Sequence, residues 1–305
     1  MKRNAYGRDF GLSTRMLLTM FTLGLIYVVF FVVLLQLTSS ILFVVVIMGA
    51  LAFFQYFTSD KIALLASGAK VVGPDEAPQL HAMVERLAAM ADLPKPRVAV
   101  IPSPVPNAFA TGRNQKHSVV AVTQGLWDRL DEPEIEGVLA HELTHVANRD
   151  VAVMTIASFF SMVAAMLARF GLWGGMFSGG DRDRGGGAPA WLILFAVSLL
   201  TYVISWILIM MISRYREYAA DRGAALITGA PENLMSALQK IASRMTQIPQ
   251  QDLREVAGMN AFFIVPTNVK KATAELFMTH PPLEKRLARL ADIAREMGKP
   301  VPVEL

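Results

Sequence analysis

Residues 141–145 read His-Glu-Leu-Thr-His and carry three side chains that can perform hydrolysis. On a helix, His141 and His145 lie one turn apart on the same face, so both imidazoles can hold one zinc ion. Glu142 lies beside that face, where its carboxylate can take a proton from a water molecule that the metal activates. The alternative is an exposed helix with two unrelated histidines, but the whole chain has only five histidines. The pentapeptide therefore predicts a zinc site with a catalytic carboxylate.

A third zinc ligand must come from elsewhere in the chain, because a hydrolytic zinc usually has three protein ligands and one open position. The chain has no cysteine, and the six residues after His145 contain no histidine. In the later segment 213–224, Glu217 and Asp221 are four residues apart and share a helical face. We predict that Glu217 binds zinc and that Asp221 accepts a hydrogen bond from a ligating histidine. The alternative is a solvated acidic pair in local ion pairs with Arg214, Arg216 and Arg222.

The elements that must position these residues include four apolar stretches near the length that crosses a bilayer, about 20 residues. They are residues 16–37, 41–57, 151–168 and 190–212. The composition agrees with membrane spans, since the chain is 53% hydrophobic and only 18% charged. The first stretch is too long for a cleavable signal peptide and has no cleavage site after it. The third is less apolar, and a buried core helix is its alternative.

The orientation of the spans follows from their basic flanks. The residues before the first span that predict a cytoplasmic N-terminus are Lys2, Arg3, Arg8 and Arg15. The predicted organisation is a cytoplasmic N-terminus (1–15), two transmembrane hairpins (16–57 and 151–212, with an external Gly-rich loop at 174–189) and two cytoplasmic catalytic segments (58–150 and 213–305). The second hairpin returns the chain to the side it left. Glu217 and His145 are therefore expected to meet at or just above the membrane surface.

Two long motifs together resemble one family. HELTHVANRD, then SRYREYAADRGAA after a transmembrane hairpin, with two spans ahead, resembles the HtpX family of membrane heat-shock zinc metalloproteases, which is grouped with the CAAX prenyl proteases. The resemblance covers nearly the whole chain. It implies a mainly α, α+β membrane protein with four transmembrane helices and a cytoplasmic gluzincin-like metalloprotease domain that contains a small β-sheet. It also implies one Zn²⁺ per chain on His141, His145 and Glu217, with Glu142 as catalytic base.

Residues 106–112 resemble the segment that lines the substrate cleft of this family. They lie between two strand-like runs, 97–101 and 118–122, which predict a hairpin. An exposed strand edge can bind an extended peptide through main-chain hydrogen bonds. We therefore predict substrate binding at Asn107, Ala108 and Phe109. For Asn107 the alternative is an ordinary loop residue.

The sequence Thr-His-Pro-Pro at residues 279–282 resembles the late His-Pro-Pro of the same family. His280 is predicted to be catalytic, as a donor to the oxyanion that forms during peptide hydrolysis. Its alternative is structural, because Pro281 also suits the first turn of a helix predicted at 282–297.

The predicted function is zinc-dependent endopeptidase activity in the cell (inner) membrane, as part of stress response and quality control. The resemblance implies that the substrates are misfolded or damaged membrane proteins, or unfolded polypeptides, on the cytoplasmic side. We expect no nucleic-acid partner, because the net charge is only +4 and there is no Lys/Arg run.

Three alternatives remain. Acidic residues precede the motif, namely Asp131, Glu132, Glu134 and Glu136, and the polar residues 148–150 follow it. They disfavour an intramembrane protease, because charges are costly in lipid. An inert membrane scaffold is disfavoured by the intact set of zinc-site residues. Processing of prenylated proteins is disfavoured by a membrane part of only four spans.

Overall fold

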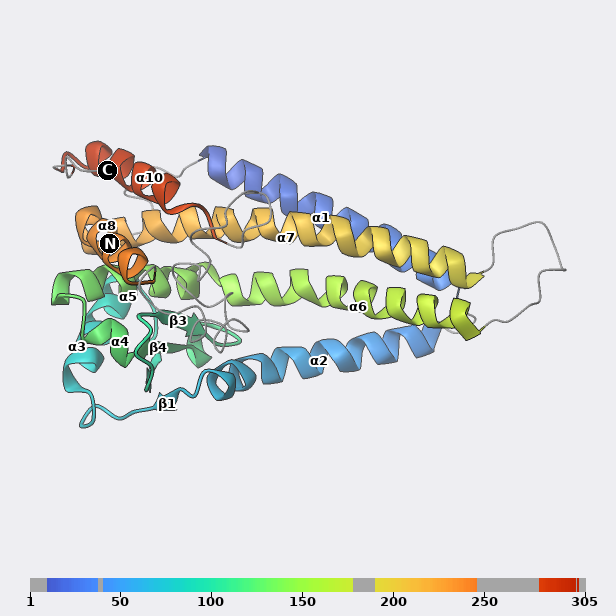
Figure 1. Ribbon diagram of the computed structural model, residues 1–305, viewed down its shortest axis with the longest axis horizontal. Coiled ribbons are helices and arrows are strands. Elements are labelled where there is room, and N and C mark those ends of the chain that lie inside the picture. Colours follow the sequence, from blue (N-terminus) through green and yellow to red (C-terminus); the bar gives the residue numbers. More distant parts are fainter. Residues whose placement is uncertain (1–9, 38–40, 178–189, 246–279, 300, 302–305) are drawn as a thin grey trace, which may run out of the picture. The chain divides into compact units, whose positions relative to one another are not determined.

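The protein is mainly helical, with one small sheet, as Figure 1 shows for the computed structural model. The residues that the structure describes are 10–37, 41–177, 190–245, 280–299 and 301. Residues 1–9 of the predicted N-terminal segment, residues 178–189 of the predicted external loop and Thr279 lie outside them. The described residues form two compact units, an apolar one (Phe10–Phe57 and Val153–Ile212) and one from Thr58–Ala152 and the described parts of Ser213–Leu305.

Four helices contribute to the apolar unit. They are α1 (Phe10–Leu37), the first part of α2 (Ile41–Ala66), most of α6 (Asp150–Phe177) and the first part of α7 (Ala190–Thr228). Tyr27 of α1 is buried against α6 and donates a hydrogen bond to the carbonyl of Ala157 at 2.6 Å. Large apolar side chains such as Leu17 and Phe21 are exposed, which suits contact with lipid.

Among the described residues, three helices are long and apolar enough to cross a membrane. The segments are Phe10–Gln36, Asp150–Trp173 and Trp191–Thr228. The span expected at 41–57 lies within α2, where the apolar segment Val46–Thr58 is shorter. The second of the four spans therefore stays a prediction.

The sheet of the other unit has four strands in the order β1-β2-β4-β3. They are β1 (Lys70–Val71), β2 (Arg97–Ile101), β3 (Ala108–Thr111) and β4 (Val119–Thr123). β2 and β4 are parallel, whereas β3 is antiparallel to β4. The predicted hairpin of 97–101 with 118–122 is therefore wrong. The connection holds a further strand, β3, which reverses the chain so that β4 returns beside β2 in the same direction.

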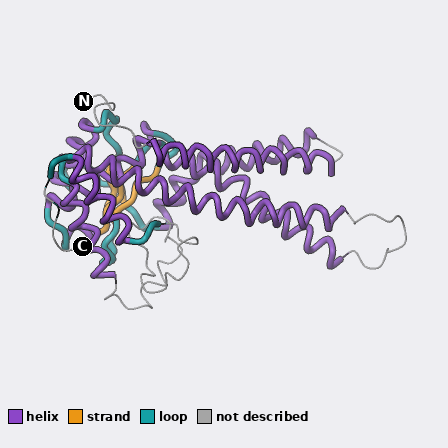
Figure 2. Tube along the Cα trace, turned by 90° about the horizontal axis from the view of Figure 1, so that it is seen from above, coloured by secondary structure: helices purple, strands orange, loops and turns teal. Residues whose placement is uncertain are grey.

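Helix α5 (Glu132–Asn148) packs against the sheet through β3 and β4, which Figure 1 labels. Figure 2 shows the strands of the sheet among the helices and loops of this unit. The other helical elements of the unit are α3 (Pro78–Met90), a 3₁₀ turn (Gln115–His117), α4 (Gln124–Trp127), α8 (Pro231–Met245) and α10 (Leu283–Glu296). A capping box begins α5, in which the Asp131 amide donates to Glu134 at 2.9 Å. Leu139 and Leu143 on its buried face are fully inaccessible to solvent.

The end of α5 is set by one residue. Arg149 has φ 59° and ψ 36°, a left-handed conformation that ends a helix. Helix α6 begins at the next residue, Asp150. The helix with the His-Glu-Leu-Thr-His motif and the helix with the third apolar stretch are therefore separate elements joined by a sharp break.

Candidate active site

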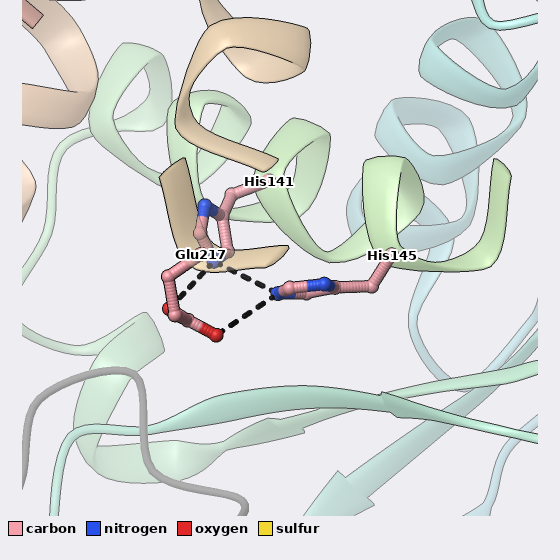
Figure 3. A group of neighbouring side chains, drawn as sticks. All are labelled: His141, His145 and Glu217. Atoms are coloured by element: carbon pink, nitrogen blue, oxygen red, sulfur yellow. Dashed lines mark hydrogen bonds and ion pairs between the residues drawn. The ribbon is translucent and has the colours of Figure 1, made fainter. Parts of the chain in front are cut away.

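Helix α5 holds the motif in the interior of its unit, with both histidines on one face as predicted from their spacing. His141 is 1% exposed and Glu142 is 5% exposed. The Nε2 atoms of His141 and His145 lie 3.1 Å apart (Figure 3). The two rings therefore direct the same nitrogen toward one point.

Glu217 of α7 completes this cluster from a segment distant in sequence (Figure 3). Its Oε2 atom lies 3.5 Å from Nε2 of His141, and its Oε1 atom lies 3.4 Å from Nε2 of His145. One ligand atom from each of the three residues lies within 4.8 Å of the others. The structure thus brings together the three residues that the sequence predicts as metal ligands.

Asp221, one turn further along α7, supports His141. Its Oδ1 atom lies 3.0 Å from Nδ1 of His141. The carboxylate is in turn held by Arg286 of α10, whose Nη2 and Nε atoms donate to Asp221 at 2.6 and 2.9 Å. Burial opposes the ionisation of Asp221, but the guanidinium of Arg286 and the bond to His141 outweigh it and lower the pKa of Asp221.

His145 has a similar arrangement with different residues. Its Nδ1 atom lies 2.6 Å from Oδ2 of Asp150, the first residue of α6. The Nε atom of Arg216 lies 3.1 Å from the other oxygen, Oδ1. Burial alone would lower the pKa of His145, but the bonds to Asp150 and Glu217 raise it to about 10.

The donor atoms fit a divalent metal ion. When each imidazole is neutral and its Nδ1–H is bonded to a carboxylate, its Nε2 atom carries a lone pair. Those two lone pairs face each other and the carboxylate of Glu217. Oε2 of Glu217 is buried and has no hydrogen-bond partner among the described residues. Electron-rich atoms that converge in this way need a cation between them, and two imidazoles with one carboxylate suit zinc.

Glu142 lies beside this cluster and is bonded to the edge of the sheet. Its Oε2 atom accepts a hydrogen bond of 2.8 Å from the amide of Ala110 in β3. Burial raises the pKa of Glu142, although the neighbouring histidines and this amide oppose the shift. Its carboxylate therefore binds a proton more strongly than an exposed glutamate does.

His280 lies at the same cluster, next to Glu217. It is 6% exposed, and its Nδ1 atom lies 3.2 Å from Oε2 of Glu217. Burial would raise the pKa of Glu217, but the charge of His280 and the close approach of His141 and His145 outweigh it and hold this pKa well below its usual value. The described helix α10 begins three residues after His280, at Leu283.

The segment predicted to bind substrate leads into β3. The carbonyl of Asn107 accepts from the amide of Thr123 at 2.9 Å, so Asn107 faces β4. In an antiparallel pair this orientation alternates, so the amides and carbonyls of Ala108 and Ala110 point away from β4. The Phe109 side chain is buried in a cluster with Ile101. Phe109 can therefore contribute structure, whereas the outward main chain of β3 can meet a peptide.

Comparison with known proteins identifies the family. Residues 74–294 match the model of Peptidase family M48. The chain belongs to peptidase family M48. Protease HtpX homolog 2 of Methanosarcina mazei is 51% identical over 98% of this chain and 100% of its own length. Protease HtpX homolog of Moorella thermoacetica is 52% identical over 97% of this chain and 98% of its own length.

A solved structure shows the same fold. The crystal structure of S. mikatae Ste24p aligns with a TM-score of 0.56 and 21% identity, over 92% of this chain and 66% of that one. The predicted fold, a mainly helical membrane protein with a small sheet, is confirmed. The predicted resemblance to HtpX is confirmed as well, and this M48 chain is a membrane metalloprotease.

Sequence reasoning missed three side chains of this M48 site, namely Asp150, Arg216 and Arg286. The sequence alone indicates Asp150 only as a polar residue that flanks the motif, and Arg216 only as an ion-pair partner in the alternative of a solvated acidic pair. Asp150 is 4% exposed and Arg286 is 2% exposed. Two features of the sequence could have indicated them: Arg216 directly precedes Glu217, and Asp150 follows His145 by five residues. A buried carboxylate needs a cationic partner, so an arginine and an aspartate near the predicted ligands are candidates for such a pair.

Proposed function

We propose that the protein is a zinc endopeptidase that cleaves misfolded or damaged membrane proteins on the cytoplasmic side of the inner membrane, in quality control during stress. The observation that carries the enzymatic part is the convergence of two Nε2 atoms and the Glu217 carboxylate beside Glu142. The three apolar helices support a substrate that is also in the membrane. The basic residues at the N-terminus support the cytoplasmic side.

In this proposal His141, His145 and Glu217 hold one Zn²⁺, which would polarise the scissile carbonyl and make water more acidic. Glu142 takes a proton from the attacking water and then passes it to the leaving amine. The raised pKa of Glu142 assists the first transfer, because the carboxylate binds the proton more strongly. The amide of Ala110 fixes the carboxylate and so keeps the base close to the strand edge.

His280 is proposed to stabilise the oxygen that becomes negative when water attacks. Its Nδ1 faces Glu217, and in the doubly protonated ring the Nε2–H on the other side would donate to the substrate oxygen. Asp221 would orient His141 through Nδ1 and keep its Nε2 available as a ligand.

The substrate is proposed to bind as an extended strand along β3. The outward carbonyls of Ala108 and Ala110 and the outward amide of Ala108 offer main-chain hydrogen bonds that do not depend on the substrate sequence, whereas the amide of Ala110 is bonded to Glu142. Asn107, at the start of this edge, is proposed to contact the peptide as well. Such binding suits a protease that acts on unfolded segments of many proteins.

The experiment is a comparison of purified wild type with Glu142→Gln. We expect the variant to bind one zinc per chain and to lose cleavage of an unfolded protein such as casein. Glu132→Gln is the matched control, because Glu132 is exposed in the first turn of the same helix. Cleavage by Glu142→Gln at the wild-type rate would overturn the proposed mechanism, as would full activity in protein stripped of metal by a chelator.

A further inference from the structure

We propose that Asp150 is a positioning residue of the metal centre, which holds His145 through Nδ1 and is itself fixed by Arg216. The inference rests on the proposed zinc site and adds to it two residues of the sequence motifs, Asp150 and Arg216, to which the motifs alone assign no role. Asp150 is 4% exposed, so its carboxylate is removed from solvent and depends on these partners.

The left-handed residue at the end of α5 makes this contact possible. Asp150 is five residues after His145, and in a continuous helix it would lie roughly 140° around the axis from it. Arg149 breaks the helix with φ 59°, and the first turn of α6 then directs Asp150 back toward the last turn of α5. The result is the 2.6 Å contact of Oδ2 with Nδ1 of His145.

Arg216 fixes the second oxygen of the same carboxylate. Its Nε atom lies 3.1 Å from Oδ1 of Asp150, and its side chain is 13% exposed. It directly precedes Glu217 on α7, so the two side chains leave the helix about 100° apart. One turn of α7 thereby supplies the metal ligand Glu217 and also Arg216, the cation that pairs with the carboxylate at His145.

Asp150 acts on the metal through the chemistry of His145. A carboxylate at Nδ1 keeps the proton on that nitrogen, so Nε2 presents its lone pair to the point it shares with His141 and Glu217. The negative charge also makes Nε2 a stronger donor. Asp221 and Arg286 do the same for His141, so each ligating imidazole has its own carboxylate and arginine.

A purely structural role would act differently. Asp150 lies in the first turn of α6, where a negative charge stabilises the helix through its dipole. That effect would change the thermal stability and would leave metal affinity and ligand geometry unaltered. The two roles are therefore separable by measurements on the metal.

The experiment measures zinc dissociation constants by competition with a chelator, and the visible spectrum of the cobalt(II)-substituted protein. We expect Asp150→Asn to weaken zinc binding about 10–100-fold and to alter the cobalt spectrum. Asp128→Asn is the matched control, because Asp128 is exposed on α4's C-terminal side and bonds only to Gln124 among the contacts described. It should leave both readouts unchanged.

Arg216→Gln is the second variant, for which the carboxylate remains but is held by one partner fewer. We expect a smaller loss of zinc affinity in the same direction. Wild-type zinc affinity and an unchanged cobalt spectrum in both Asp150→Asn and Arg216→Gln would overturn the inference. Failure of the wild type to bind zinc would instead overturn the proposed function.

Discussion

Gly223 of α7 lies directly against Thr144 of α5, so closely that a Cβ atom on Gly223 would stand 2.2 Å from Cγ2 of Thr144. Thr144 is between the two histidines and its hydroxyl donates to the carbonyl of Ala140 at 2.8 Å. The side chain therefore has a fixed position and cannot move aside. This contact sets the separation of the helix with His141 and His145 from the helix with Glu217.

We expect Gly223→Ala to push these two helices apart and to weaken metal binding. The better helix propensity of alanine gains at most about 1 kcal/mol. Overpacking typically costs about 1–3 kcal/mol, and a 2.2 Å contact favours the upper end, so the net effect is destabilising. The midpoint temperature of thermal unfolding and the amount of zinc bound per chain should both decrease. Gly24→Ala in α1 is the control, because no atom lies within 4 Å of its Cβ position; equal behaviour of the two variants would contradict the prediction.

Arg286→Gln should destabilise the protein by about 3–5 kcal/mol, because it leaves the buried carboxylate of Asp221 without its cation. Chemical denaturation of the detergent-solubilised protein measures the loss. Arg295→Gln on the same helix is the matched control: its ion pair with Asp292 is exposed and is worth at most about 1 kcal/mol. If Arg286→Gln lowered the free energy of unfolding no more than the control does, the ion pair of Arg286 with Asp221 would not stabilise the fold.

Zinc uptake at pH 7 should release protons. The pKa of His145 is raised to about 10, so this ring carries an extra proton at pH 7, and the raised pKa of His141 favours a proton on the second ring as well. A metal ligand must be deprotonated, so binding expels these protons, and zinc affinity increases as the pH rises. Calorimetry in buffers of different ionisation enthalpy measures the release. A binding heat that is the same in all buffers would contradict this sign.

Single cysteines test the predicted orientation, because the chain has no cysteine of its own. Lys116 is exposed in the unit with the metal site. Ser39 stands between the apolar stretches 16–37 and 41–57, and a cytoplasmic N-terminus predicts that this connection is external. We expect an impermeant maleimide to label Ser39→Cys in intact cells and Lys116→Cys only after the membrane is opened. Labelling of Lys116→Cys from outside would place the catalytic unit on the other side.

The residues that the sequence identified are those whose relationship is local or is fixed by helix periodicity. His141, Glu142 and His145 share one turn of helix, and Glu217 and Asp221 share another. The meeting of the two turns was inferred from a hairpin of apolar stretches, and the structure places the side chains within reach of one ion. Helix periodicity indicates which side chains share a face, and the length of the apolar stretches indicates that the chain returns to the same side of the membrane.

The residues that the sequence did not identify depend on backbone geometry or on distant packing. Asp150 reaches His145 only because Arg149 adopts a left-handed conformation that is uncommon for arginine. Arg286 reaches Asp221 from a helix 65 residues later in the chain. The hairpin prediction was wrong because the strand Ala108–Thr111 is only four residues long and lies between proline, asparagine and glycine residues that are typical of a loop. Neither φ angles nor tertiary partners are encoded by pattern alone.

The pairing of carboxylates with guanidinium groups keeps the interior of the site electrically balanced in two different ways. Four acidic side chains (Glu142, Asp150, Glu217 and Asp221) face two cations (Arg216 and Arg286), which leaves two negative charges uncompensated. A divalent ion supplies two positive charges, and so do two imidazolium protons on His141 and His145. Neutrality is therefore preserved whether the polypeptide holds metal or protons. We therefore expect the polypeptide to fold before it acquires its ion, unlike small zinc domains whose structure depends on the metal.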